Sequence, residues 1–415
     1  MNNPDYLLRH SFMLLAASQV SNLCNVLFQM VMGRWLSLAE YGILASMLGV
    51  ILISGLPLNA LSNAAAFFSA QLQQQQRAGD ILSLVRAWTW KLSAVTLALL
   101  VSGVALSGFF SNFFKLPDRI PFMVALAVLA LSLYPPIIGG ALQGIQAFGW
   151  GAVSAASMGV VRLLSSAALV GGMAAMAGWA LVGQGLGVIV GAAIGLLGLR
   201  LVLRRSVGSA EKLPPGRVYL LRTLGVLAFF SFLMNADVLI VKHYFDPDAS
   251  GLFARAGTIG RAIVFLPMPI AGALFPKTVS AGGMSVQHGR LLRRALLYSA
   301  LLVIPTALLG TLFPQVPLGL LYHDWRPEAA MANLVRATIW ALSPLSLAYV
   351  IMHFELAQNR FGLAWPLLLA VAGYLIGVAL WHATVLQVVA VLAVVSFLTL
   401  IVLVMAIPGK EKSSC

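Results

Sequence analysis

Residues Met234–Lys277 read MNADVLIVKHYFDPDASGLFARAGTIGRAIVFLPMPIAGALFPK. The polar residues at 243–250 include two aspartates and a proline, which favour a turn and end a helix. The flanking residues are apolar enough for two membrane helices, but they carry Asp237, Arg255 and Arg261. Charges are costly inside hydrocarbon, so ionisable residues at such positions are candidates for a functional site. The stretch therefore predicts a membrane hairpin that carries buried charges.

The composition of the chain is that of a polytopic membrane protein. Of its 415 residues, 60% are hydrophobic and 9% are charged, whereas soluble domains carry about 25% charged residues. The net charge is +14, and most Lys and Arg lie in alternate loops, as the positive-inside rule predicts. This distribution argues against a nucleic-acid partner. The two cysteines, Cys24 and Cys415, match neither a disulfide framework nor a metal-ligand cluster.

The sequence predicts an all-α protein with about twelve transmembrane helices, because a membrane helix needs about 20 apolar residues. The charge distribution places both termini in the cytoplasm. The predicted spans are Ser11–Gly33, Tyr41–Phe67, Leu92–Phe113, Ile120–Leu142, Gly151–Met173, Gly178–Val202, Leu221–Val241, Gly251–Phe275, Arg294–Pro314, Ala329–Met352, Gly362–Trp381 and Val385–Ile407.

The two halves of the chain resemble each other in sequence. Asn25–Gly42 aligns with Met234–Gly251 without a gap, and both segments end in an aromatic-apolar pair, acidic residues and Gly. After one added residue, the Leu-Pro pair that contains Pro57 aligns with the pair that contains Pro267. A repeat of about half the chain is typical of many transporters. We interpret the two prolines as hinges, because proline removes a helix hydrogen bond and permits a kink.

The predicted organisation follows from this repeat. Residues 1–205 form an N-terminal six-helix lobe, and residues 206–220 form a basic cytoplasmic linker that contains Pro-Pro-Gly. Residues 221–408 form a C-terminal six-helix lobe, and residues 409–415 form a cytoplasmic tail. The glutamine-rich segment 69–91 is predicted to lie along the headgroups as an amphipathic helix.

Four charged residues fall inside the predicted spans. A rise of about 1.5 Å per residue puts Asp237 and Arg255 at similar depths on neighbouring helices, which predicts an ion pair; Asp237 is alternatively a site for a coupling ion. Arg162 and Arg261 lie near the bilayer midplane with no acid at their depth. We therefore expect them to face a wet cavity, one from each half, that binds an anion. Guanidinium groups suit phosphate oxygens in particular. The alternative is that helix-end carbonyls or water satisfy each arginine.

Catalytic signatures are absent from the sequence. It holds no phosphate-binding loop of the Walker type, no His-Glu-x-x-His and no Gly-x-Ser-x-Gly. The six histidines are scattered over different loops and helix ends. We therefore expect no catalytic residue, no metal site and no cofactor, and transport is favoured over catalysis.

Four motifs carry a resemblance to a known family. They are Gly33–Gly42, Gly140–Gly149, Leu266–Pro276 and Glu355–Gly362, each at the end of a predicted span. With them the chain resembles the polysaccharide-biosynthesis flippase branch of the multidrug/oligosaccharidyl-lipid/polysaccharide exporter superfamily. The resemblance implies two six-helix lobes, alternating access and a lipid-linked oligosaccharide that moves from the inner to the outer leaflet.

The resulting hypothesis is a multi-pass flippase of a bacterial inner membrane. A polyprenyl-diphosphate-linked oligosaccharide would bind Arg162, Arg261 and Arg255 during surface polysaccharide biosynthesis. The expected partners are this substrate, membrane lipids and glycan-assembly proteins. Three alternatives stay open: a cation-coupled multidrug antiporter of the same fold, a membrane glycan polymerase or ligase, and a scaffold subunit of a glycan-assembly complex.

Overall fold

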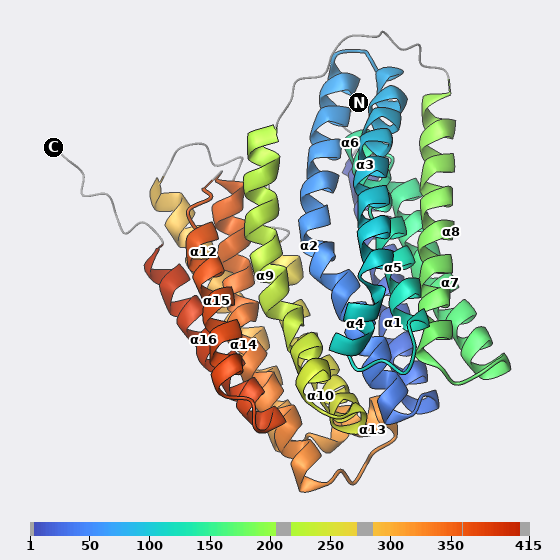
Figure 1. The fold of residues 1–415 in the computed structure, drawn as a ribbon. Coiled ribbons are helices and arrows are strands. Elements are labelled where there is room, and N and C mark those ends of the chain that lie inside the picture. The colour runs from blue at the N-terminus through green and yellow to red at the C-terminus, as the bar shows by residue number, and fades with distance from the viewer. Residues whose placement is uncertain (1–3, 205–216, 272–284, 359, 407–415) are drawn as a thin grey trace. The chain divides into compact units, whose positions relative to one another are not determined.

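A computed structural model describes residues 4–204, 217–271, 285–358 and 360–406, without the side chains of residues 4–18, 217–220 and 285–288. The regular elements of these ranges are all helices (Figure 1). The chain divides into two compact units, Met1–Leu220 and Leu221–Cys415, called unit 1 and unit 2 below. Most of the predicted linker, and the predicted tail 409–415, lie outside the described residues.

Unit 1 consists of apolar helices joined by short turns. Its helices are α1 (Pro4–Trp35), α2 (Leu38–Gln74), α3 (Asp80–Ala105), α4 (Ser107–Phe113), α5 (Ile120–Ser132), α6 (Pro135–Gly144), α7 (Phe148–Gly172) and α8 (Ala177–Leu203).

Unit 2 contains helices of similar length. They are α9 (Arg217–Tyr244), α10 (Pro247–Phe265), α12 (Ser285–Leu312), α13 (Gln315–Tyr322), α14 (Ala329–Ala357), α15 (Ala364–Leu380) and α16 (Val385–Met405). Because α9 begins at Arg217, the helix includes the last residues of the predicted linker.

Ten helical segments in the described part of the chain are long and apolar enough to cross a membrane, with α5 and α6 counted together as Ile120–Gly144. The prediction of a multi-pass membrane protein is thereby confirmed. The helix α15 is apolar but shorter, with 17 residues, and α1 is a helix of 32 residues that is not among the ten. The count of twelve spans and the cytoplasmic position of both termini stay predictions.

Prolines and one turn account for the differences from the predicted spans. The fourth predicted span is interrupted between α5 and α6, because Pro135 and Pro136 stand at the start of α6 and cannot donate to the preceding turn. The prediction of an interfacial helix at 69–91 is wrong. There α2 runs on to Gln74, a short turn follows, and α3 begins at Asp80 and continues into its apolar part.

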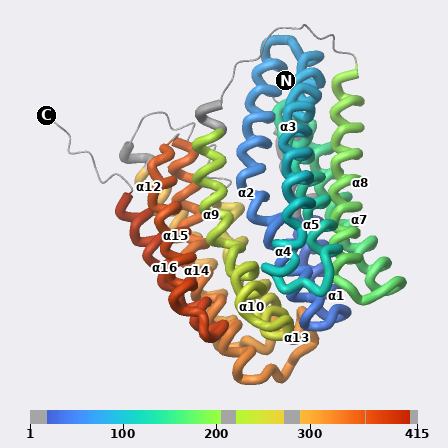
Figure 2. The backbone as a smooth tube through the Cα atoms, viewed as in Figure 1, coloured from blue at the N-terminus to red at the C-terminus, as the bar shows by residue number. Residues whose placement is uncertain are grey.

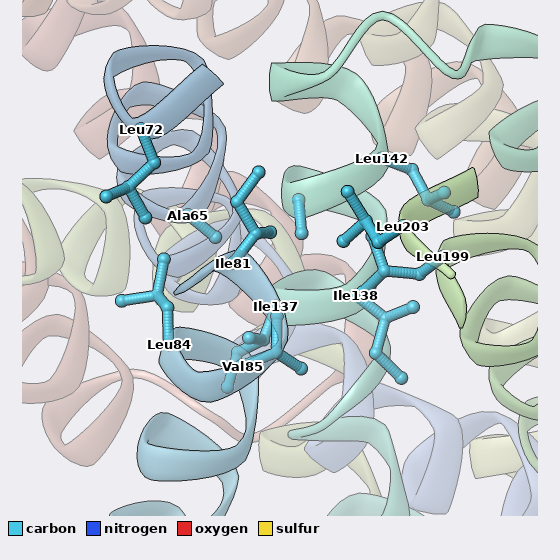
Figure 3. Close-up of a cluster of buried hydrophobic side chains, with 11 residues drawn as sticks. Ala65, Leu72, Ile81, Leu84, Val85, Ile137, Ile138, Leu142, Leu199 and Leu203 are labelled. Carbon is cyan, nitrogen blue, oxygen red and sulfur yellow. The ribbon is translucent and has the colours of Figure 1, made fainter. Parts of the chain in front are cut away.

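The core of unit 1 explains why this turn is held in place. A salt bridge of 2.8 Å joins Arg77 to the buried carboxylate of Asp80, and next to it a cluster of apolar side chains gathers from α2, α3, α6 and α8 (Figure 3). The cluster consists of Ala65, Leu72, Ile81, Leu84, Val85, Ile137, Ile138, Ala141, Leu142, Leu199 and Leu203.

The two units share an order of helix packing. In unit 1, α2 packs on α5 and α6, these pack on α8, and α7 packs on α8; in unit 2, α10 packs on α14, and both α14 and α15 pack on α16. The second helix also begins alike in both. Ser37 caps α2 with its side chain, which accepts from Glu40 N at 3.2 Å. Asp246, at the aligned position, caps α10 and accepts from Ala249 N at 2.8 Å.

Candidate charged sites in the two units

The helices α7 and α8 run side by side in both views of the backbone (Figures 1 and 2). Their approach depends on glycines spaced four residues apart on α8. A Cβ atom at Gly183 would lie 2.5 Å from Ser166 N, and one at Gly187 would lie 2.6 Å from Met158 O. At Gly191 it would lie 2.8 Å from Met158 Cβ. Small residues at this spacing let two membrane helices come into backbone contact. This close packing fixes the position of the α7 backbone that carries Arg162.

Arg162 lies near the middle of α7 and reaches side chains of two other helices. It donates a hydrogen bond to Oε1 of Gln184 on α8 at 3.2 Å and another to Oδ1 of Asn25 on α1. Its guanidinium carbon lies 4.3 Å from the centre of the Phe28 ring, also on α1. Arg162 therefore joins three helices of unit 1 through two amide oxygens and one aromatic face.

The charge of Arg162 is solvated by neutral groups only. In the part of the chain that the structure describes, no carboxylate forms a salt bridge with it. Its Nε atom is buried and has no hydrogen-bond partner there. The sequence-based alternative named helix-end carbonyls or water as its partners, whereas the two acceptors in the structure are side-chain amide oxygens. The net positive charge nevertheless remains in the unit.

Arg261 has a different environment, which corrects the expectation that no acid matches it. It lies on α10 with 8% of its surface exposed, and Asp237 on α9 is 1% exposed. The Arg261 Nη1 atom lies 2.9 Å and 3.0 Å from the two carboxylate oxygens of Asp237. The predicted partner of Asp237 was Arg255, and that prediction is wrong.

The direction of helical side chains explains this pairing. Side chains lean toward the N-terminal end of their helix. The helix α10 begins at the turn after α9, so Arg261 leans back toward the turn, whereas Asp237 leans away from it. Gly257 leaves room for the guanidinium, since a Cβ atom there would lie 2.8 Å from Arg261 Nη2. Two groups that start at different depths therefore meet.

Arg255 lies one and a half turns before Arg261 and packs against a ring. Its guanidinium carbon is 5.0 Å from the centre of the Tyr322 ring on α13, and the Tyr322 hydroxyl donates to the Arg255 carbonyl at 3.4 Å. The structure thus does not bring Arg255 together with Asp237, although both lie in unit 2.

The two prolines of the aligned pairs occupy different local structures. Pro57 lies inside α2, which is unbroken from Leu38 to Gln74. Pro267 follows the end of α10 at Phe265, and the chain resumes helical backbone for a few residues after it. Their action as hinges stays a prediction.

Sequence reasoning missed the neutral partners of Arg162. Asn25 and Gln184 are polar residues in otherwise apolar helices, and that pattern was the available signal. It also missed that Lys242 and Glu355 are buried, since both were assigned to helix ends. No group of His, Cys, Asp or Glu in the described residues could hold a metal ion.

The resemblance motifs serve helix packing in the structure. Glu40 accepts from Ala177 N at 2.6 Å, which joins the start of α2 to the start of α8, where a carboxylate suits the helix dipole. A Cβ atom at Gly140 would lie 2.1 Å from Ser62 O, so this glycine permits the contact of α6 with α2. The part of the third motif at 272–276 lies outside the described residues.

Comparison with solved structures gives the fold. No protein-family model and no curated protein sequence matches the chain. A structure of the lipid II flippase MurJ in an inward closed conformation is similar, with a TM-score of 0.70 and 11% identity over 95% of this chain and 87% of that chain. An inward-facing multidrug resistance MATE family transporter of the MOP superfamily is similar with a TM-score of 0.68 and 12% identity, over 94% of this chain and 96% of that one. The chain therefore shares its fold with these membrane transporters of known structure.

Proposed function

We propose that this protein is an alternating-access transporter that flips a polyprenyl-diphosphate-linked oligosaccharide from the cytoplasmic to the periplasmic leaflet. The observation that carries the proposal is Arg162, a guanidinium in the middle of a membrane helix whose charge no described carboxylate neutralises. An unmatched charge at that depth is expensive. An anionic group on the substrate would compensate it.

The chemistry of Arg162 suits a diphosphate. A guanidinium presents several donors in a plane and binds phosphate oxygens through two parallel hydrogen bonds. Asn25 and Gln184 orient the group from α1 and α8 without cancelling its charge. Arg261 is already neutralised by Asp237, so we assign it and Arg255 a secondary part in substrate binding. This weighting replaces the sequence-based hypothesis, in which Arg162 and Arg261 were the main contacts and Arg255 an additional one.

The fold agrees with a flippase. One similar structure is that of a lipid II flippase, and by its name that protein acts on a lipid-linked substrate. The similar order of helix packing in the two units and the aligned N-caps Ser37 and Asp246 support two lobes that arose by an internal repeat. Such repeats underlie alternating access in many transporters.

Flipping in vesicles tests the proposal. Purified protein is reconstituted with a fluorescent polyprenyl-diphosphate disaccharide, and the fraction that becomes accessible to an external quencher is followed with time. We expect R162Q to lower the initial rate about tenfold or more, because a charge-assisted hydrogen bond contributes about 1.5–3 kcal/mol. The matched control is R119Q, which removes an exposed arginine outside the membrane helices. If R162Q flips as fast as the control at equal protein content, the substrate site is wrong.

The second candidate, a cation-coupled multidrug antiporter, also has a specific observation in its favour. The MATE transporters share the fold, and Asp237 is a carboxylate buried in the membrane part of unit 2, a residue type that can take a proton or a cation. Expression of the wild-type protein in a strain without drug exporters distinguishes the two functions. An antiporter raises tolerance to cationic dyes and loses the effect in D237N, whereas a flippase gives no tolerance.

The cellular setting is part of the same proposal. We place the protein in a bacterial inner membrane, in surface polysaccharide biosynthesis, beside glycan-assembly proteins. Deletion of the gene should then cause lipid-linked single repeat units to accumulate on the cytoplasmic side. Accumulation of unligated polymer on the outside would instead indicate that the protein acts in glycan ligation.

A further inference from the structure

The helices α3 and α12 each join a basic end to a long exposed apolar face. In α12, Arg290, Arg293 and Arg294 are exposed, and Tyr298 follows one turn after Arg294 with 56% of its surface exposed. Exposed Leu and Ile side chains continue along the helix to Leu312. The other side of α12 packs on α10 and α14, so this face belongs to the outside of the unit.

The length of the apolar face places its basic end. From Arg294 to Leu312 the helix rises about 27 Å, close to the hydrocarbon thickness of about 30 Å. If Leu312 lies near one boundary of the hydrocarbon, Arg294 lies near the other. The arginines are then level with lipid phosphates, and Tyr298 lies at the interface where aromatic rings are enriched.

Among the described residues, no salt bridge involves Arg290, Arg293 or Arg294. No Asp or Glu occurs between Asp248 and Asp324. Arg290, Arg293 and Arg294 therefore form a positive surface that an anionic group would stabilise.

Unit 1 repeats the arrangement in its third helix, α3. Arg86 and Lys91 are exposed, and Trp90, one turn after Arg86, is 74% exposed. Exposed aliphatic side chains follow on this helix as well, and Asp80, the nearest acid in α3, is engaged by Arg77. The recurrence of a basic residue and an aromatic residue four positions apart, ahead of an apolar face, is an observation independent of α12.

We infer that Arg290, Arg293, Arg294 and Tyr298 bind the headgroup of an anionic phospholipid of the surrounding bilayer, whose acyl chains lie along the exposed face of α12. Arg86, Trp90 and Lys91 on α3 form a second and weaker site of the same kind. Charge complementarity selects an anionic over a zwitterionic lipid, because each Lys or Arg near a membrane surface adds about 1 kcal/mol of attraction. The site is separate from Arg162 and does not depend on the transported substrate.

Lipid binding to the purified full-length protein tests the inference by native mass spectrometry. The protein in detergent is titrated with phosphatidylglycerol or with phosphatidylcholine of the same acyl chains. We expect the wild-type protein to bind phosphatidylglycerol more tightly than phosphatidylcholine. In R290Q/R293Q/R294Q, the affinity of the tighter phosphatidylglycerol site should fall about tenfold or more. In R86Q/K91Q, the weaker site should no longer bind this lipid.

The control variant K115Q/R119Q/R326Q removes the same charge from exposed positions that lie outside these helix faces. It should bind phosphatidylglycerol like the wild-type protein; an equal loss in the control would show that only net charge matters and would overturn the inference. A polyprenyl diphosphate is titrated in parallel. Displacement of phosphatidylglycerol from α12 by that lipid at equal concentration, or binding of that lipid alone, would also overturn it. Each variant is first checked for a single species by size-exclusion chromatography.

Discussion

Arg162 of unit 1 and Arg261 of unit 2 are both guanidiniums in membrane helices, Arg162 partly exposed and Arg261 buried, and their surroundings differ. Arg261 is neutralised by Asp237 within a two-helix hairpin. Arg162 is held by Asn25, Gln184 and the face of Phe28, across three helices. A buried ion pair leaves no net charge for a ligand, whereas neutral oxygens orient a guanidinium and leave its charge in place.

The alignment of the two halves sharpens this comparison. Phe28 and Asp237 occupy the same position in the aligned segments Asn25–Gly42 and Met234–Gly251, and each contacts an arginine of its own unit, Arg162 and Arg261 respectively. One position of the first helix thus offers an aromatic face in unit 1 and a carboxylate in unit 2. The two arginines lie on different helices of their units, Arg162 on α7 and Arg261 on α10, so the aligned position meets a charge that reaches it from a different element in each unit.

The largest expected effect is the loss of the carboxylate in unit 2. D237A leaves Arg261 buried without its partner, which should destabilise the protein by about 3–5 kcal/mol. For a unit of this size that corresponds to a decrease of about 10 °C in the midpoint of thermal unfolding. Unfolding in detergent, followed by tryptophan fluorescence, measures it.

The double variant D237L/R261M serves as the control for that experiment. It removes both charges and fills the space with apolar side chains, so it should unfold closer to the wild-type temperature than D237A does. If the single variant were no less stable than the double variant, the ion pair would not hold α9 and α10 together.

A smaller effect is expected from filling the space beside each arginine. In G187A the new methyl group meets the backbone oxygen of Met158 at 2.6 Å, so α7 and α8 must separate, which costs about 1–3 kcal/mol. In G257A the methyl group meets the end of the Arg261 side chain at 2.8 Å, which can move. The gain in helix propensity from Gly to Ala is about 1 kcal/mol in both.

We therefore expect G187A to unfold at a lower temperature than the wild type, and G257A to stay close to it. The same fluorescence measurement compares the two variants side by side. A greater loss in G257A would mean that the contact of Arg261 with Asp237 is more rigid than the contact of α7 with α8.

The smallest effect concerns the ring in unit 1. F28L removes the aromatic face under Arg162 and should destabilise the protein by about 0.5–2 kcal/mol. The test is a double-mutant cycle with R162M, read from thermal midpoints. If F28L costs the same in the R162M background, the loss comes from packing alone and the ring does not stabilise the charge.

The sequence by itself determined the class of the protein and most of its helices. Apolar runs of about 20 residues have no other stable environment than a membrane, so composition was sufficient for the multi-pass prediction. The aspartates and the proline at 243–250 also indicated the turn between α9 and α10, because the preference of these residues for turns is local. The break at Pro135 has a local cause as well.

Only the tertiary structure decided which charges meet. Depth along a helix placed Asp237 level with Arg255, but that estimate counts Cα positions and ignores the direction in which side chains lean. Arg261 reaches Asp237 because the two lean toward each other, and Arg162 finds Asn25 from a segment 137 residues away. Such contacts depend on helix packing, and here glycines such as Gly187 set that packing through their lack of a side chain.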